Sequence, residues 1–377
     1  MHFTLHLSNT CNMKCGYCYV FEKKSEYKPL IMSKDIAFKS IDMASLNSSK
    51  AGIIFFGGEP LLFRDTIEDV IRYSKEKSGS CNYFFKITTN GLLLDESFID
   101  LSLKENIFIA ISIDGTKNSH DKHRKDSSGS GTYDVVIENA KKLLKKKPYS
   151  PVLMTVNPDT VDEYCTGVKS LFEIGFAYII CSLNYAANWT DADMKKLSHQ
   201  YELLADFYYE HMVLEDKFYL SPFEVKISSH VNNKTYKHER CELGKRQISI
   251  GPDGSLYPCV QFVGDNRFII GNVDDGIDEN KRLLLFYQNE KEKPECDRCF
   301  IRSRCNHYCA CLNKQATGSI DEISPVLCAH ERIILPIADK VAYKLYKEKN
   351  PLFIQKHYND FYPVVSMVED RKYKFKD

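Results

Sequence analysis

Three cysteines near the amino end form the most chemically specific pattern in this sequence. Cys11, Cys15 and Cys18 stand in the run CNMKCGYC, a CxxxCxxC arrangement that follows a short strand-like run. A [4Fe–4S] cluster used only for electron transfer is normally held by four cysteines, so three leave one iron without a protein ligand. Structural zinc fits less well, because it requires a closed tetrahedral set and usually takes CxxC pairs. The pattern therefore predicts an iron–sulfur cluster whose free iron is open to a small molecule.

A second cysteine framework begins near residue 240. Its members are Cys241, Cys259, Cys296, Cys299, Cys305, Cys309 and Cys328, with Gly254 in the gap between the first two. Spacing alone fits two kinds of site, namely iron–sulfur clusters or a zinc ribbon built on CxxC-like pairs. Either way, these cysteines are predicted to be metal ligands.

The elements that must position the first three cysteines alternate between strand-like and helix-like segments. Short apolar runs occur at Phe3–Leu7, Gly52–Phe56, Tyr83–Thr89, Ile107–Ile113, Pro151–Val156 and Tyr178–Leu183. Charge-bearing helical segments separate them, near 34–46, 65–77, 96–104, 133–146, 160–174 and 191–212. Six such units predict parallel strands covered by helices, as an open or closed barrel. In a barrel of this kind the segments after each strand line one pocket.

Several polar residues follow these strands and are candidates for that pocket. The second strand ends in GGEP, where Gly57 and Gly58 let the backbone approach a ligand and Glu59 can accept hydrogen bonds from an ammonium group. The next two strands end in TTNG, with Asn90, and SIDG, with Ser112. Their short hydroxyl and amide groups suit ribose hydroxyls, although a simple turn and helix capping are the alternative explanations.

Two further candidates come later in the barrel region. Arg124 offers a planar fork matched to a carboxylate, or is a solvated loop arginine. Leu183 ends the sixth strand and could form an apolar wall for adenine, or belong to the core. Both predictions depend on the strand ends meeting at one edge of the sheet.

Bulk composition excludes several classes of function. The chain has 377 residues with 51 basic and 51 acidic side chains, so it has no charge excess that would favour binding to nucleic acid or an anionic membrane. No signal peptide precedes the first strand, and no apolar run reaches the ~18 residues that a membrane span needs. Fourteen cysteines in such a chain indicate metal binding in a reducing cytoplasm rather than disulfides.

The amino-terminal motifs resemble those of the radical S-adenosylmethionine (radical SAM) enzymes. The resemblance rests on CxxxCxxC with Tyr17 before the last cysteine, on GGEP, and on the order HDxxR…GxGxYD. It implies that the free iron chelates the amino and carboxylate groups of SAM and that SAM is cleaved to a 5′-deoxyadenosyl radical. It also implies SAM contacts at Tyr17, Gly57, Gly58, Glu59, Asn90, Ser112, Arg124 and Leu183.

The second framework resembles the SPASM domain of radical SAM peptide-modifying enzymes, which holds two auxiliary [4Fe–4S] clusters. The resemblance assigns one cluster to Cys296, Cys299, Cys305 and Cys328, and the other to Cys241, Cys259 and Cys309. Cys81, Cys165 and Cys181 are then small core residues, while Cys311 could complete the second set. The expected fold is α/β: a partial (β/α)6 TIM barrel over 1–215, a connector over 216–240, a SPASM domain over 241–335, and a carboxyl-terminal helix and tail over 336–377.

Within this family the sequence favours one reaction. In anaerobic sulfatase maturases an aspartate that acts as base follows the cysteine equivalent to Cys259, but here Val260 follows it and cannot take a proton. Asp265 lies nearby and could substitute for that aspartate. The sequence alone therefore assigns no protein base. The stretch YPCVQFVG instead resembles maturases that form thioether crosslinks in ribosomally made peptides, where an auxiliary cluster with three protein thiolates accepts a substrate Cys. A formylglycine-forming maturase and a C–C crosslinking peptide maturase are the alternatives.

The resemblance also implies partners. The expected substrate is a ribosomally synthesised precursor peptide containing Cys, and the expected electron donor is a flavodoxin or ferredoxin. Because the chain begins on the first barrel strand, leader recognition is expected from the connector, the tail or a separate protein. Neither nucleic acid nor membrane is expected as a partner.

Overall fold

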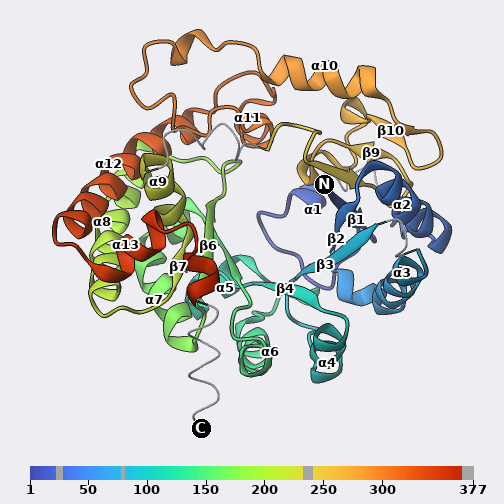
Figure 1. The fold of residues 1–377 in the computed structure, drawn as a ribbon, viewed down its shortest axis with the longest axis horizontal. Coiled ribbons are helices and arrows are strands. Elements are labelled where there is room, and N and C mark those ends of the chain that lie inside the picture. Colours follow the sequence, from blue (N-terminus) through green and yellow to red (C-terminus); the bar gives the residue numbers. More distant parts are fainter. Residues whose placement is uncertain (23–28, 78–80, 232–240, 367–377) are drawn as a thin grey trace.

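A nine-stranded sheet organises the molecule. The computed structural model describes residues 1–22, 29–77, 81–231 and 241–366. The strand order is β7-β6-β5-β4-β3-β2-β1-β8-β9, and every neighbouring pair from β7 to β8 is parallel (Figure 1). The first seven strands are β1 (His2–His6), β2 (Lys50–Phe56), β3 (Asn82–Thr89), β4 (Ile107–Ser112), β5 (Val152–Val156), β6 (Tyr178–Leu183) and β7 (Tyr219–Leu220).

Helices follow the strands in the order that the alternation predicts. They are α2 (Lys34–Asn47), α3 (Arg64–Glu76), α4 (Glu96–Lys104), α5 (Lys117–His123), α6 (Tyr133–Lys146), α7 (Tyr164–Ile174) and α8 (Asp191–Val213). Several begin at a polar N-cap; for example, Ser33 accepts from the N–H of Ile36, and Asp95 from that of Phe98. The predicted (β/α)6 partial barrel is confirmed, with the short α5 as an element that the hydrophobic pattern did not reveal.

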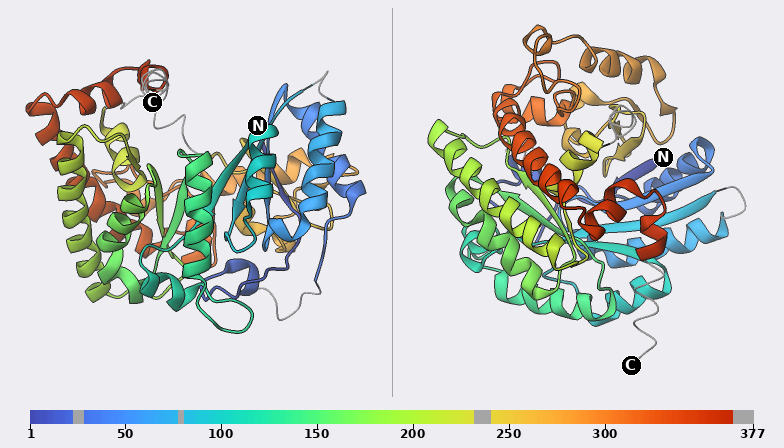
Figure 2. Two further views of the ribbon diagram at one scale, coloured as in Figure 1. Left: turned by 90° about the horizontal axis from the view of Figure 1, so that it is seen from below. Right: turned by 60° about the vertical axis from the view of Figure 1, so that its left-hand side comes forward.

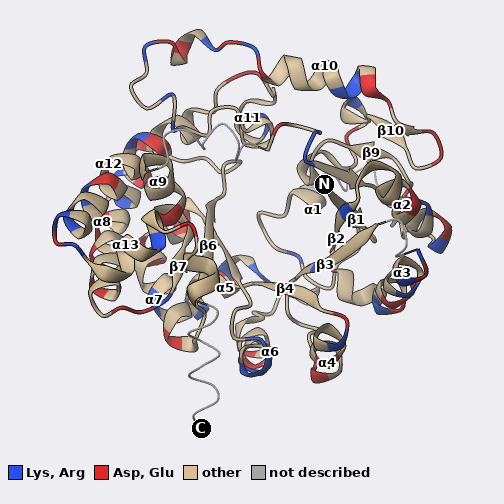
Figure 3. Ribbon diagram, in the orientation of Figure 1, with Lys and Arg blue, Asp and Glu red and all other residues tan. Residues whose placement is uncertain are grey.

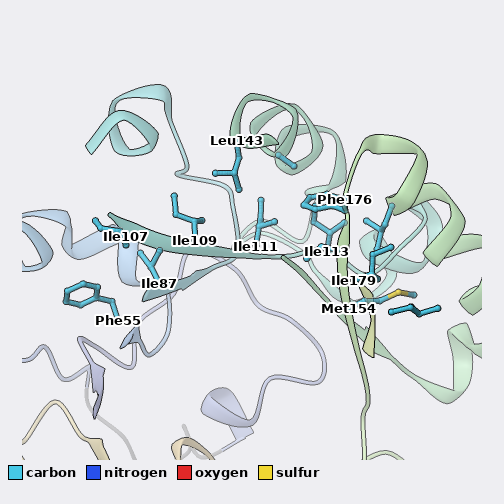
Figure 4. Packing of buried hydrophobic residues seen from close by; sticks show 14 of the residues in the cluster. Phe55, Ile87, Ile107, Ile109, Ile111, Ile113, Leu143, Met154, Phe176 and Ile179 are labelled. Atoms are coloured by element: carbon cyan, nitrogen blue, oxygen red, sulfur yellow. The ribbon is translucent and has the colours of Figure 1, made fainter. Parts of the chain in front are cut away.

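The barrel core lies between the sheet and these helices. Ile87, Ile109 and Ile111 on neighbouring strands are fully buried, and Leu143 of α6 packs over the same face (Figure 4). Runs of β-branched residues suit parallel strands that are covered on their faces. This core fixes the strand ends on which the candidate residues stand.

The sheet continues into the cysteine-rich part of the chain. Strand β8 (Gln247–Ile250) pairs parallel with β1, and β9 (Leu256–Tyr257) pairs antiparallel with β8. The boundary predicted at residue 241 therefore does not separate two independent sheets. Cys241 and Cys259 flank these two strands, so the edge of the barrel sheet positions both thiols.

The segment 216–240, predicted as a connector with little pattern, contains regular structure. Strand β7 extends the sheet, and α9 (Ser221–Val231) buries Phe223 and Ile227 while packing against β6. Lys226 of α9 also makes a buried ion pair with Glu331 at 2.7 Å. The described residues of this segment up to 231 therefore carry a strand and a helix in place of the little pattern that was expected. Residues 232–240 lie outside the described residues, as do residues 367–377 of the predicted tail.

The remaining helices cross from one edge of the sheet to the other. The hairpin β10 (Gly271–Asn272) and β11 (Gly276–Ile277), then α10 (Glu279–Asn289) and α11 (Ala310–Thr317), lead to α12 (Pro325–Lys347) and α13 (Pro351–Tyr358). Figures 1 and 2 show this region, drawn in orange to red, passing from the β8–β9 side to α12, which packs on α8 and α9. The cysteine-rich region therefore spans the opening of the sheet.

Surface charge is mixed. Figure 3 shows Lys and Arg interspersed with Asp and Glu along the outer helices. Within the described ranges, no helix is both long enough and apolar enough to cross a membrane.

Candidate active site

The loop that carries Cys11, Cys15 and Cys18 leaves the carboxyl end of β1 and ends at α1 (Tyr19–Glu22). All three cysteines are free and half-buried. The loop is fastened by its backbone, since the N–H of Lys14 donates to the carbonyl of Lys125 at 2.8 Å and that of Gly16 to His123 at 3.0 Å. Cys11 lies close enough to Cys15 and Cys18 for their charges to interact. The structure thus brings the three predicted ligands together.

The glycines of GGEP permit close contact with this loop. The N–H of Gly58 donates to the carbonyl of Ser8 at 2.8 Å, and the N–H of Glu59 donates to that of Thr10 at 3.0 Å. A Cβ atom at Gly58 would stand 1.8 Å from the Thr10 carbonyl oxygen, so any side chain here would force the backbone to shift. At least part of the reason for glycine here is therefore the approach of the cysteine loop.

The carboxylate of Glu59 joins the ends of β2 and β3. It is buried, and it accepts hydrogen bonds from the Leu61 N–H at 3.0 Å, the Thr89 hydroxyl at 2.7 Å and the Asn90 N–H at 2.7 Å. Burial raises the pKa of Glu59, and these three donors oppose that shift. A carboxylate accepts about four hydrogen bonds, so little capacity remains for the ammonium group that the sequence suggested.

Asn90 reaches the cysteine loop directly. Its side-chain amide donates to the Asn12 side chain at 2.8 Å and lies 3.6 Å from the Cys11 sulfur. Ser112, at the end of β4, is half-buried. Leu183 is buried at the end of β6 as a member of the main core.

Arg124 is the terminal member of a buried polar chain. It donates to the Tyr17 hydroxyl at 2.7 Å, which donates to Asp114 at 2.6 Å, and Asp114 also accepts from the Thr155 N–H at 3.0 Å. Asp114 is the aspartate of the SIDG run at the end of β4, for which helix capping was the alternative explanation. Burial raises the pKa of Asp114, and the nearby Arg124 charge opposes this shift.

One atom of Arg124 has no partner. Its Nε–H is buried without a hydrogen bond inside the described part of the chain. An unmade hydrogen bond on a buried charged group costs free energy, so this position suits an anionic acceptor such as a carboxylate. Because Arg124 also lies near Cys15, that acceptor would stand beside the cysteine loop.

The second framework forms two groups of thiols. Buried Cys259 lies with exposed Cys241 and half-buried Cys309. Cys311 joins them, because its sulfur is 3.5 Å from that of Cys309 and it contacts Cys259. The sequence left the position of Cys311 open.

The other group contains Cys296, Cys299, Cys305 and Cys328. Cys296 lies near Cys299 and Cys328, and Cys305 lies near Cys328. Arg332 of α12 donates to the Cys299 sulfur at 3.5 Å. Among all residues that the structure describes, no three Cys, His, Asp or Glu side chains are close enough together to hold a single metal ion.

A pocket lies where the barrel meets the cysteine-rich region. Its lining comes from the β1 end and α1 on one side and from the segment after β8 on the other: His6, Ser8, Asn9, Tyr19, Val20, Leu30, Pro252, Asp253, Tyr257, Val260, Val263 and Gly264. Tyr19 follows Cys18, and Val260 follows Cys259. The pocket is therefore bordered by both thiol-bearing segments.

Asp265, the alternative base, is engaged elsewhere. Its carboxylate accepts from Arg267 at 2.7 Å and 2.9 Å and from Lys314 at 2.8 Å. The Arg267 hydrogen bonds, followed by those of Lys314, hold the pKa of Asp265 well below its usual range. Such a carboxylate is a poor proton acceptor near neutral pH.

Comparison with known proteins identifies both parts of the chain. Residues 5–169 match the radical SAM superfamily, and residues 241–300 match SPASM, an iron–sulfur cluster-binding domain. The chain is 27% identical over 327 residues to a cysteine-type anaerobic sulfatase-maturating enzyme of Clostridium novyi, covering 81% of this chain and 82% of the relative. It is 22% identical over 352 residues to the radical SAM cyclopropyl synthase TigE of Paramaledivibacter caminithermalis, covering 88% and 72%.

Solved structures show the same fold. Native anSMEcpe with bound AdoMet matches with a TM-score of 0.80 at 21% identity, over 92% of this chain and 99% of that one. Streptococcus suis SuiB bound to the precursor peptide SuiA matches with a TM-score of 0.60 at 15% identity, over 87% and 75%. The chain accordingly contains a radical SAM domain and a SPASM domain, whose cofactors are SAM, a [4Fe–4S] cluster and auxiliary iron–sulfur clusters.

Proposed function

We propose that this chain installs thioether crosslinks, from Cys sulfur to carbon, in a ribosomally synthesised precursor peptide. Several proteins that it resembles act on or bind polypeptides by name, including the sulfatase-maturating enzyme and SuiB with its precursor peptide. The junction pocket, open to both thiol-bearing segments, supports a peptide side chain as the substrate.

The observation that carries the choice of reaction concerns the stretch directly after Cys259, where neither the next residue nor nearby Asp265 offers an available carboxylate base. Val260 lines the pocket where sulfatase maturases are expected to have an aspartate, and Asp265 is held by Arg267 and Lys314. Formation of an aldehyde from Cys or Ser needs a group that accepts the substrate proton. A thioether-forming reaction makes less demand on such a base, because a substrate thiol can already be deprotonated when it bonds to carbon.

The barrel residues fit the cofactors of the family. Cys11, Cys15 and Cys18 would hold the [4Fe–4S] cluster, and the unpartnered Nε–H of Arg124 suits the carboxylate of SAM. When bound, these cofactors supply a 5′-deoxyadenosyl radical that abstracts hydrogen from carbon. Asp114 and Tyr17 orient Arg124 and prevent it from turning toward solvent.

Besides the polar side chains of His6, Tyr19 and Asp253, the pocket has an apolar part. Val20, Val260 and Val263 present apolar surface there, which excludes water from a reactive carbon radical. An external electron donor, for which flavodoxin or ferredoxin is the candidate, would reduce the clusters. Leader recognition by this chain or by a separate protein belongs to the same proposal.

The test is co-expression with a short Cys-containing peptide encoded beside the gene, followed by mass spectrometry. Thioether formation predicts loss of two hydrogens per crosslink together with loss of alkylatable thiols. Loss of two hydrogens with every thiol still alkylatable would indicate C–C crosslinking, and a free aldehyde would indicate sulfatase-type maturation. The Cys15→Ala variant serves as the control and should leave the peptide unmodified.

A further inference from the structure

A fourth thiol lies within the first auxiliary group. The sulfur atoms of Cys309 and Cys311 are 3.5 Å apart, and Cys311 also contacts Cys259. Cys241 lies near Cys259 and Cys309, so all four belong to one neighbourhood. Family resemblance assigned only three of these thiols to a cluster.

Local structure explains why Cys311 faces this group. Cys309 is the N-cap residue of α11, and Cys311 is the second residue of that helix. The first turn of a helix presents unpaired N–H groups and partial positive charge, which stabilise thiolates. Cys311 packs against a small buried core that includes Cys259, Phe262 and Ala310, so its side chain is directed inward.

A neighbouring hydroxyl supports an anionic centre here. The Tyr19 hydroxyl is buried and has no hydrogen-bond partner within the described residues, and it lies near Cys18, Cys259 and Cys311. A buried O–H without an acceptor costs free energy, whereas thiolate or sulfide sulfur accepts hydrogen bonds. The tyrosine therefore fits beside a cluster held by these thiols.

The other cysteines outside the predicted sets have different surroundings. Cys165 lies near Lys169 and Asp206, and Cys181 bonds to Tyr164. Both belong to the barrel, where they act as small core residues. Cys311 differs from them because it meets two of the predicted ligands.

We propose that Cys311 is the fourth protein thiolate of the auxiliary cluster that Cys241, Cys259 and Cys309 hold. Ligation requires the sulfurs of Cys309 and Cys311 to separate from their present contact, which rotation about the Cα–Cβ bonds permits. The cluster then has no free iron in the resting protein, in contrast to the open cluster that the resemblance implied. The assignment rests on the four thiols alone, but a closed cluster leaves no iron for a substrate Cys, so the thioether reaction proposed above would have to bind its Cys thiolate elsewhere.

The test uses the full chain with Cys11, Cys15 and Cys18 replaced by Ala, so that only auxiliary clusters remain. The reduced, reconstituted protein is examined by electron paramagnetic resonance before and after addition of 2-mercaptoethanol, a thiol that binds a free iron. A closed set predicts an unchanged spectrum. A spectrum that shifts with the added thiol would overturn the assignment, and this measurement needs no change at Cys311.

A matched pair of variants sharpens the result. In the same background, Cys311→Ala should yield a [3Fe–4S] signal on mild oxidation or a thiol-dependent spectrum, with up to about four fewer irons per chain. Cys181→Ala, the control, should leave iron content and spectrum unchanged. The proposal is wrong if Cys311→Ala and Cys181→Ala give the same iron content and the same spectrum.

Discussion

The barrel and the cysteine-rich region both gather thiols, but they hold them by different means. In the barrel, the cysteine loop is fixed by backbone hydrogen bonds to GGEP and to residues 123–125, next to the large core of the sheet. In the cysteine-rich region, the thiols stand on short helices and turns that pack on two small cores. In the part of the chain that the structure describes, the buried residues of the smaller core are only Ile301, Cys305 and Leu335.

This difference has a physical consequence. A loop positioned by a sheet keeps its geometry whether or not a cofactor is bound, as preorganised sites do. A segment with little apolar burial cannot offset its conformational entropy alone, so ligand binding contributes to its folding. The barrel is expected to shape a site for SAM, and the clusters are expected to shape the cysteine-rich region.

Removal of iron should produce the largest difference in stability between the two regions. Chelation is expected to speed amide hydrogen exchange in residues 294–309 by about 100-fold or more, because metal binding is coupled to folding there. Strands β1 to β4 should change little. Hydrogen-exchange mass spectrometry of the anaerobic protein before and after chelation measures the exchange rates of both regions. An equal rise in exchange rate in the two regions would contradict the comparison.

Within the barrel site, Arg124→Lys should weaken SAM binding. Lysine keeps the charge but loses the planar fork and the Nε–H, and a charge-assisted hydrogen bond contributes about 1.5–3 kcal/mol, or roughly 10- to 100-fold in Kd. Equilibrium dialysis without reductant measures the affinity. Lys125→Ala, which alters the exposed neighbour, is the control, and identical affinities for the two variants would exclude Arg124 from the site.

Gly58→Ala tests whether backbone contact fixes the cysteine loop. The added Cβ meets the Thr10 carbonyl, and relieving such overlap typically costs about 1–3 kcal/mol. Urea unfolding should show this loss together with weaker SAM binding. Gly129→Ala meets no atom within 4 Å and should leave SAM binding intact despite its left-handed φ of 90°. Unchanged SAM binding in Gly58→Ala would show that the loop is positioned otherwise.

The smallest effect concerns pH. His120 accepts from the Asp114 N–H at 3.3 Å and bonds to Thr132 at 3.0 Å, and burial lowers the pKa of His120 to about 3. Since the unfolded chain binds a proton at this histidine near pH 6.5 and the folded chain does not, stability falls as pH drops below 6.5. The difference in unfolding free energy between wild type and His120→Gln should shrink by about 1 kcal/mol from pH 7.5 to 5.5. A pH-independent difference would mean that His120 does not titrate in this way.

The sequence predicted most of the barrel because its signals are local. Alternating apolar runs and charged helices gave six strands and their helices within a few residues of their observed bounds. The pairing of β8 with β1 was not predictable in this way, since it joins residues more than two hundred positions apart. Helix α9 was missed because its buried pair, Lys226 and Glu331, is polar and the partner comes from α12.

The site shows the same limit. Cysteine spacing indicated which thiols belong together, yet Cys311 could be placed only once α11 brought it against Cys259 and Cys309. The chain from Asp114 through Tyr17 to Arg124 joins three separate segments, so no spacing rule reveals it. Asp265 appeared available in the sequence because proximity to Arg267 does not reveal an ion pair, and its second partner, Lys314, lies 49 positions away.

The most direct test of the account is SAM cleavage by the reduced protein and two cysteine variants, followed as release of 5′-deoxyadenosine. Wild type should release it, Cys15→Ala should release none, and a folded Cys241→Ala should retain cleavage without modifying peptide. Release by Cys15→Ala at the wild-type rate, or intact SAM in the reduced wild type, would contradict the claim that the amino-terminal loop holds the reactive cluster.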